Sequence, residues 1–167
     1  MILNHPVKEI NERRVTLRGV VCDVDGILTN GEIIVSAQGE QLHSFHALDG
    51  FGIINLVESG FVFAVISGRE NPAARIRCED LGATEIHLDV ADKHEKMSQL
   101  VEKYNIPFNQ WAVIGDDIND VACLNSVDFS FTVPQAHPAA IHAANFITTR
   151  NGGQGAVREI SDWLLNK

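Results

Sequence analysis

Short apolar runs alternate with longer amphipathic stretches along most of the chain. The runs are continuously apolar, as is typical of parallel strands that are covered on both faces. We predict strands at Val15–Cys22, Phe61–Ile66, Thr84–Leu88, Trp111–Ile114, Val127–Val133 and Asn145–Thr148. We predict helices at Gly50–Ser59, Pro72–Leu81, Lys93–Tyr104, Asp117–Asn125, Pro138–Ala144 and Ala156–Leu165. This alternation indicates right-handed βαβ units and an α/β fold with a doubly wound parallel sheet.

Residues 31–48 interrupt the alternation. Two extended segments, Glu32–Ser36 and Gln41–Phe45, flank a turn at Ala37–Glu40. This pattern predicts a β-hairpin inserted between the first strand and the first helix. A lone hairpin is marginally stable, so we expect it to pack against the body or a second subunit. It is either a surface flap or a device for oligomerisation that also covers a site.

Length and charge narrow the class of protein. The 167 residues, of which 45% are hydrophobic and 21% charged, suit a single domain over residues 1–167. No apolar run approaches the roughly 20 residues that span a bilayer, and residues 1–14 do not resemble a signal peptide. We therefore expect a cytoplasmic protein. The net charge of -9 and the lack of a basic stripe argue against nucleic-acid and membrane partners.

Cysteine and histidine spacing gives no sign of a zinc site. Cys22, Cys78 and Cys123 show no CxxC spacing and cannot all pair, so neither a disulfide framework nor structural zinc is indicated. In an extended segment, His43 and His46 would face opposite sides, which argues against a histidine metal site.

The strongest chemical signal is the sequence Asp23-Val24-Asp25-Gly26, directly after a buried strand. Placing two carboxylates at a buried strand end is costly unless something neutralises them. A carboxylate nucleophile at Asp23 needs a divalent cation between it and an anionic phosphate. Asp25 can then protonate the leaving oxygen and deprotonate the attacking water. The alternative is a turn in which these residues only cap the chain.

Two further segments carry groups suited to phosphate. Ser67, Gly68 and Arg69 close the second strand, where a hydroxyl and backbone N–H groups can bind phosphate oxygens. Lys93 begins a helix directly after Asp92. A lone lysine there is usually a solvated surface residue, so its significance depends on the other motifs.

The fourth strand ends in a cluster of acidic residues. Asp116, Asp117 and Asp120 lie within five residues, with Asn119 between them. These carboxylates would repel one another without a cation, and hard oxygen ligands suit Mg²⁺. Acidic residues also occur at helix starts for capping alone. The four motifs follow successive elements in order, which favours one catalytic site.

These motifs resemble those of the haloacid-dehalogenase superfamily of phosphotransferases, over roughly residues 19–120. The resemblance implies that Asp23 is the nucleophile, Asp25 the general acid/base, and Ser67 and Lys93 the phosphoryl-binding groups. It implies Mg²⁺ held by the Asp23 carboxylate, the Asp25 carbonyl and Asp116, supported by Asp117, Asn119 and Asp120. The second Asp favours hydrolysis over dehalogenation. The chain is similar to the small group without a cap domain.

Further motifs are most similar to the 3-deoxy-D-manno-octulosonate 8-phosphate phosphatase family. They include Asp49-Gly50-Phe51-Gly52-Ile53, residues 77–82, and Gly152–Glu159. The resemblance implies a phosphorylated sugar-acid substrate, a role in lipopolysaccharide precursor synthesis, and a homotetramer whose hairpins close the active sites. The substrate-binding residues it suggests are Asp49, Gly50, Gly52, Gly68, Arg69 and Arg77.

Two positions depart from that family. Leu48 and Ile54 stand where arginines are usual, and neither can bind a carboxylate by paired hydrogen bonds. Arg69 and Arg77 remain candidates for that contact. A phosphatase of nine-carbon sugar acids (neuraminate type) or one of broad specificity is therefore the alternative. A catalytically silent oligomeric module is disfavoured because all the reacting groups are present. A phosphate relay of the response-regulator type would leave Asp25 and the hairpin unexplained.

Overall fold

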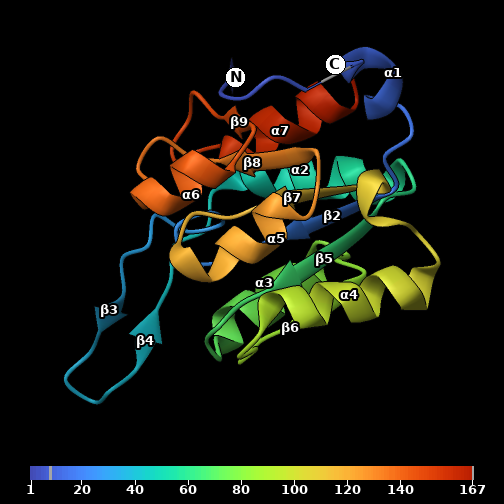
Figure 1. The fold of residues 1–167 in the computed structure, drawn as a ribbon. Helices are drawn as coiled ribbons and strands as arrows, with labels where there is room; N and C mark the ends of the chain where they lie inside the picture. Colours follow the sequence, from blue (N-terminus) through green and yellow to red (C-terminus); the bar gives the residue numbers. More distant parts are fainter. Residues whose placement is uncertain (8, 167) are drawn as a thin grey trace.

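The computed structural model describes residues 1–7 and 9–166. Within this part, seven strands form one sheet in the order β1-β9-β8-β7-β2-β5-β6 (Figure 1). Their bounds are β1 (Ile2–Leu3), β2 (Gly19–Cys22), β5 (Val62–Ile66), β6 (Glu85–His87), β7 (Trp111–Ile114), β8 (Phe129–Thr132) and β9 (Phe146–Ile147). All neighbours pair in parallel except β1 and β9. The predicted parallel α/β sheet is confirmed.

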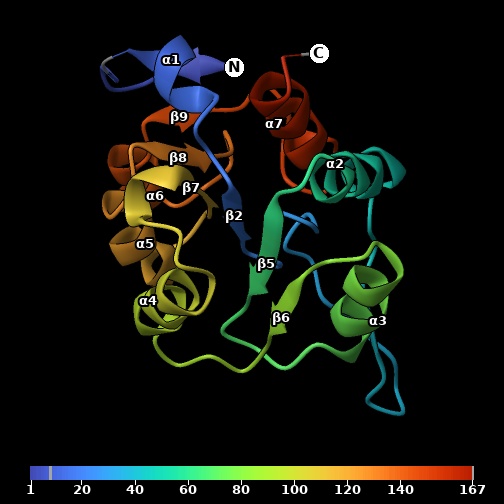
Figure 2. The ribbon, with the colours of Figure 1, turned by 90° about the vertical axis from the view of Figure 1, so that its right-hand side faces the viewer.

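Helices cover both faces of the sheet (Figure 2). One face carries α2 (Ala47–Glu58), α3 (Pro72–Asp80) and α7 (Ala156–Leu164); the other carries α4 (Lys93–Tyr104), α5 (Val121–Asn125) and α6 (Pro138–Ala143). Three short helices complete the set: α1 (Ile10–Arg14), η1 (Phe108–Gln110) and η2 (Ile118–Asp120). No helix in the described part of the chain is long and apolar enough to cross a membrane.

The central strands are buried on both faces, which explains their continuous apolar runs. All four residues of β2 and of β7 are buried. Trp111 lies against the backbone of Gly19, where a Cβ atom would overlap the indole ring, so the first position of β2 requires glycine. Cys22, Cys78 and Cys123 are buried free thiols, in agreement with the expectation that they form no disulfide framework.

The N-terminal segment was not predicted to carry regular structure. Yet β1 pairs antiparallel with β9, and the Asn4 amide donates to the carbonyl oxygens of Ile141 (2.7 Å) and Ala144 (2.9 Å). The predicted strand 15–22 begins only at Gly19, because residues 10–14 form α1. Such short elements contain too few residues for a periodic pattern.

Two helix starts also differ from the prediction. Helix α2 begins at Ala47, before the predicted Gly50, because His46 Nδ1 caps it by accepting from the Leu48 N–H (3.2 Å). The predicted helix 117–125 is divided into η2 and α5, since Asp117 and Asp120 form a capping box around η2.

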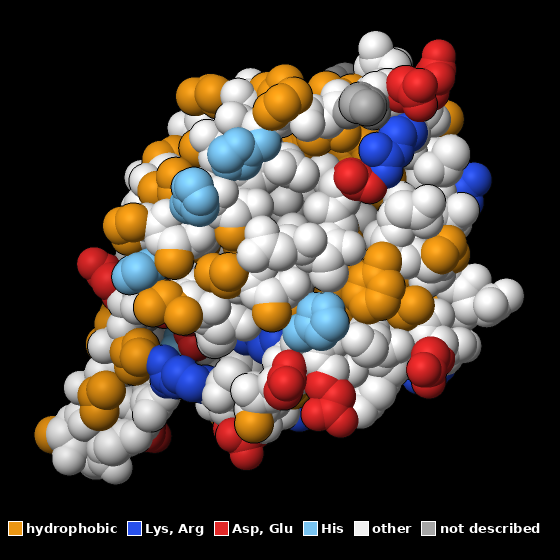
Figure 3. Space-filling model, in the orientation of Figure 1, with side chains coloured by type: hydrophobic (Ala, Val, Ile, Leu, Met, Phe, Trp, Pro, Cys, Tyr) orange, Lys and Arg blue, Asp and Glu red, His pale blue; other side chains and the backbone are white. Residues whose placement is uncertain are grey.

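The predicted hairpin is present as β3 (Ile34–Val35) and β4 (Gln41–Leu42), which pair antiparallel in a separate sheet. It projects away from the body (Figure 1). Apolar side chains lie along it (Figure 3), with Ile34 57% and Leu42 58% exposed. Between Asp23 and Ser67, a stretch described without gaps, the chain forms this hairpin, α2 and β5, and no cap domain.

Candidate active site

The chemistry-bearing residues lie where the strands end. Asp23 follows β2 and its N–H donates to the Ile114 carbonyl of β7 (3.0 Å), so the two strand ends are held together. Ser67 follows β5, and Lys93 begins α4. Because parallel strands present their carboxyl ends at one edge, these residues converge there.

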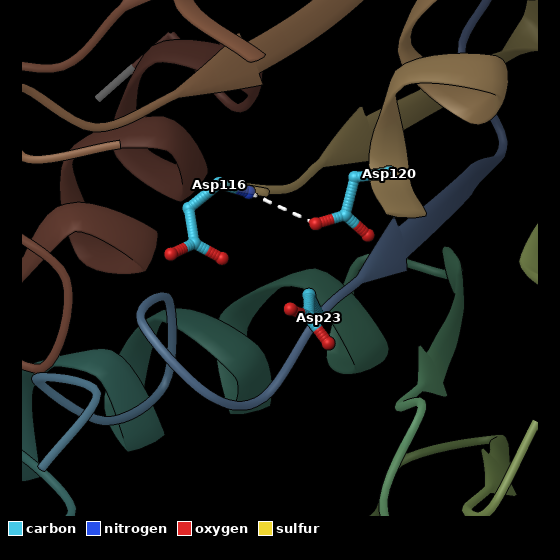
Figure 4. Close-up of side chains that lie close together, drawn as sticks. All are labelled: Asp23, Asp116 and Asp120. Atoms are coloured by element: carbon cyan, nitrogen blue, oxygen red, sulfur yellow. Dashed lines mark hydrogen bonds between the residues drawn. The ribbon is translucent and has the colours of Figure 1, made fainter. Parts of the chain in front are cut away.

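Three carboxylates meet at this edge. One oxygen each of Asp23, Asp116 and Asp120 lies within 4.8 Å of the others (Figure 4). Asp23 is only 6% exposed and Asp120 only 3%. So much buried negative charge requires positive charge close by.

Lys93 supplies part of that charge. Its Nζ lies 2.8 Å from Asp23 Oδ1 and 2.7 Å from Asp120 Oδ1, in a setting where the lysine is 4% exposed. Burial disfavours the charged amine, but the carboxylates of Asp23 and Asp120 outweigh it and raise the pKa of Lys93. Lys93 is therefore a fixed cation rather than a solvated surface residue.

One lysine does not neutralise three carboxylates. Burial and then the charge of Asp120 raise the pKa of Asp23 to about 8, against the opposing effect of Lys93. Burial and the charges of Asp120 and Asp117 raise the pKa of Asp116 to about 7. The Asp116 Oδ1 atom is buried without a hydrogen-bond partner among the described residues. A hard divalent cation is the group that this donor set fits.

Asp120 is held by the backbone of its own loop. Its Oδ2 accepts from the N–H groups of Asp116 (3.0 Å) and Asp117 (3.1 Å). A Cβ at Gly115 would overlap the Asp120 side chain, so this position needs glycine. Asp120 thus orients the Asp116 loop and pairs with Lys93.

Asp25 lies close to Arg69 and His43. Its Oδ2 is 3.6 Å from Arg69 Nη1, and its Oδ1 is 3.9 Å from His43 Nδ1. The turn that brings it there depends on Gly26, which has φ +88°, and a Cβ at Gly26 would overlap the Asp116 carboxylate.

A cavity of about 190 Å³ opens at this edge, and we call it the catalytic cavity. Its lining consists of residues predicted for the site: Asp23, Asp25, Ser67, Gly68, Arg69, Asp117 and Asn119. Ser67 is buried, and its Oγ accepts from the Arg69 N–H (3.3 Å). Three separate segments of the chain, at residues 23–25, 67–69 and 117–119, thus contribute to one concave site.

The family model described as haloacid dehalogenase-like hydrolase matches residues 79–160. The 3-deoxy-D-manno-octulosonate 8-phosphate phosphatase of Yersinia pestis is 35% identical over 157 residues, covering 94% of this chain and 84% of that protein. The chain belongs to the haloacid dehalogenase-like hydrolases. It is a phosphoric monoester hydrolase.

Other proteins that are similar to this chain are phosphatases too. The phosphatase of Escherichia coli K12 with the same name is 38% identical, over 89% of this chain and 79% of that protein. A crystal structure of the Moraxella catarrhalis phosphatase with magnesium, phosphate and the sugar acid has a TM-score of 0.92 at 32% identity, covering 96% of this chain and 92% of that one. A cobalt-bound phosphatase from Haemophilus influenzae has a TM-score of 0.87 at 35% identity, covering 92% and 90%.

Three residues predicted to bind substrate lie away from the catalytic cavity of this hydrolase. Asp49 is 2% exposed, and its oxygens accept from the N–H groups of Gly155 (3.0 Å) and Arg158 (3.1 Å). Gly50 and Gly52 bring α2 close to Arg77 and to the Arg158 backbone, where a Cβ would overlap. Their observed contacts join α2 to α3 and α7, so the role assigned to them in binding stays a prediction.

Arg77 does not line the catalytic cavity either. It is half-buried on α3, over Gly50, where it lines a small hollow with Phe45 and His46. Its assignment to substrate binding therefore also stays a prediction, whereas Arg69 reaches Asp25 directly.

Sequence reasoning missed three residues at the catalytic loop. His43 approaches Asp25 from the hairpin, although the extended pattern gave no reason to connect them. Gln135 donates its amide to the Gly26 carbonyl (3.3 Å), and Gly152 packs so closely on that carbonyl that a Cβ would overlap it. No local sequence pattern signals these contacts. Gln135 and Gly26, for example, lie more than 100 residues apart along the chain.

Proposed function

We propose that the chain hydrolyses a phosphorylated sugar acid, 3-deoxy-D-manno-octulosonate 8-phosphate, through a phospho-aspartate on Asp23. The observation that carries this proposal is the ion pairing of Lys93 with Asp23 and Asp120. Beside this pair lie an Asp116 oxygen that has no partner among residues 1–7 and 9–166 and a cavity lined by Asp25 and Ser67. A carboxylate exposed at the surface would need neither this burial nor a buried lysine beside it.

The carboxylates fit a divalent cation. Asp23, Asp116 and the Asp25 carbonyl would hold Mg²⁺, which would supply positive charge to offset the repulsion between the nucleophile and the phosphate. Asp117 and Asn119 at the cavity mouth would support that site, while Asp120 orients its loop.

Two displacements complete the reaction. An Asp23 oxygen attacks phosphorus, the bond from phosphorus to the sugar oxygen breaks, and Asp25 gives that oxygen its proton. Asp25 then takes a proton from water, whose oxygen attacks phosphorus and releases Asp23 and inorganic phosphate. Ser67, Gly68 and Arg69 would bind phosphoryl oxygens, and Lys93 would balance the charge that develops on them.

The substrate assignment rests on the named relatives, and with it we propose a role in lipopolysaccharide precursor synthesis and a location in the cytoplasm. Leu48 and Ile54, where arginines are usual, favour a nine-carbon sugar-acid phosphate or broad specificity as the second candidate. We also infer one domain over residues 1–167 and a homotetramer, because the hairpin exposes Ile34, Val35 and Leu42.

The test compares kcat/KM for octulosonate 8-phosphate, neuraminate 9-phosphate and acetyl phosphate, with Mg²⁺ and with excess chelator. We expect metal-dependent turnover of all three and the highest kcat/KM for octulosonate 8-phosphate. A higher value for neuraminate 9-phosphate would favour the second candidate. Turnover that persists in chelator, or none at all with metal, would contradict the phosphatase mechanism.

A further inference from the structure

A second cavity lies beside the catalytic cavity, between the β3–β4 hairpin and the start of α3. We call it the hairpin cavity; its volume is about 310 Å³, and it is lined by Gly39, Gln41, His43 and residues 70–73. The chain passes directly from one cavity to the other, because residues 67–69 line the catalytic cavity. A substrate held by its phosphate could therefore extend into the hairpin cavity.

Side chains at the boundary connect the two spaces. Arg69 Nη2 donates to Gln41 Oε1 of the hairpin (3.1 Å), and Arg69 Nη1 lies 3.6 Å from Asp25. His43 Nδ1 and Asp25 Oδ1 are 3.9 Å apart, too far for a hydrogen bond. Both atoms are buried without hydrogen-bond partners among the described residues. An oxygen of a bound molecule would satisfy both.

Asn71 carries a second unpaired group. The residue is 1% exposed, and its Oδ1 caps α3 by accepting from the Ala74 N–H (3.0 Å). A cap needs only this acceptor, which serine or aspartate also provides. The Asn71 Nδ2 atom is buried and has no partner within the described chain. A buried unpaired donor is destabilising, so an acceptor supplied by a ligand is favoured.

The charge of the hairpin cavity indicates what kind of group it takes. None of its lining residues is a lysine or arginine in the part of the chain described, and Glu70 is among them. The arginines at its border already face acids, Arg69 beside Asp25 and Arg75 beside Glu70, so a carboxylate here would compete with these acids for positive charge. Hydroxyl groups can both accept from Asn71 and donate to neighbouring oxygens.

We propose that the hairpin cavity binds the hydroxyl-bearing chain of the leaving group. Asn71 Nδ2 donates to one hydroxyl oxygen, and His43 contacts the oxygen nearest Asp25. Asn71 and His43 are then specificity-determining residues, and the carboxylate of the sugar acid lies outside this cavity. This inference rests on the proposed phosphatase function and names the part of the substrate that the site recognises.

The test uses Asn71→Ser, which keeps a side-chain cap for α3 and removes the Nδ2 donor. For the sugar-acid phosphate with the highest kcat/KM in the comparison above, we expect KM to rise about ten-fold with kcat within about two-fold. For acetyl phosphate, which has no hydroxyl chain, kcat/KM should fall far less. His43→Leu should show the same difference between the two substrates. The matched control for Asn71→Ser is Asn109→Ser, at an exposed position. An unchanged melting temperature of Asn71→Ser would show that the cap persists.

The outcomes are distinguishable. Asn71→Ser with the wild-type KM for the sugar-acid phosphate would make Asn71 a helix cap only and overturn the inference. An equal loss on both substrates would show that the phosphate site was disturbed, and it would also overturn the inference. In both of these outcomes, turnover of acetyl phosphate by the wild-type enzyme would leave the proposed phosphatase function intact. A wild-type protein inactive on every phosphate ester would remove the proposed function and the inference with it.

Discussion

The catalytic edge and the β3–β4 hairpin show two ways in which one chain positions side chains. At the edge, Asp23 and Lys93 are 6% and 4% exposed, and Asp23 directly follows β2 while Lys93 is the first residue of α4. In the hairpin, Ile34 and Leu42 form a cross-strand pair but are 57% and 58% exposed. The geometry of the edge is thus built into the sheet, whereas the hairpin joins the body through polar contacts such as Arg69 with Gln41.

This difference predicts different consequences of mutation. Changes at the edge should alter chemistry and stability together, because the charges there are buried and coupled. Changes in the hairpin should alter assembly and substrate preference with little effect on the stability of the body.

The largest effect is expected for Asp23→Asn. The amide is nearly isosteric but cannot attack phosphorus, so kcat for acetyl phosphate should fall more than about a thousand-fold. The fold should persist, since one of three repelling carboxylates is removed. Steady-state kinetics and a melting curve check both points, with the exposed Asp80→Asn as control. Residual turnover near wild type would assign the nucleophile elsewhere.

Asp25→Asn should separate the two chemical steps. Without the acid/base, a good leaving group such as acetate can still depart, but water is no longer deprotonated, so turnover should fall about 10²–10⁴-fold. Rapid-quench experiments should then detect a phosphorylated protein that accumulates. If Asp25→Asn turned over at the wild-type rate, the acid/base assignment would be wrong.

Lys93→Met should show how strongly the edge depends on its internal cation. Removing the amine leaves Asp23 and Asp120 buried without their partner, and breaking such a pair costs about 3–5 kcal/mol of unfolding free energy. Urea denaturation without added metal measures this loss. Lys96→Met on the same helix is the control, because Lys96 bonds only to Gln99 among the described residues. Equal stability of the two variants would contradict a buried ion-pair network.

The same contrast explains what could be predicted from sequence. Asp23 and Ser67 were predictable because each directly follows an apolar run, as Asp116 does one residue further on, and parallel strands bring such positions to one edge. The approach of His43 to Asp25, and of Gln135 and Gly152 to the Gly26 carbonyl, depends on long-range packing without a local pattern.

Cation binding and pH should act together at the edge. The pKa of Asp23 is raised from 3.8 to about 8 and that of Asp116 to about 7, so the folded chain without metal holds more protons than the unfolded chain over this range. Its stability should therefore fall as pH rises from about 4 to about 8. Because a cation binds the deprotonated carboxylates, Mg²⁺ should raise the melting temperature more at about pH 8 than at about pH 5.5. A larger shift at the lower pH would contradict this linkage.

The smallest effect on stability is expected in the hairpin. The double change Ile34→Ser with Leu42→Ser removes a cross-strand apolar pair that is exposed in the single chain, so unfolding free energy should change by less than about 0.5 kcal/mol. If a second copy covers this pair, light scattering should instead show a smaller assembly, and kcat/KM should fall for the sugar-acid phosphate more than for acetyl phosphate. Val15→Ser, exposed by 67% and distant in sequence from the hairpin, is the control. Strands of two residues each have little stability unless they pack against something. An unchanged assembly would therefore mean that the hairpin packs on its own subunit as a flap.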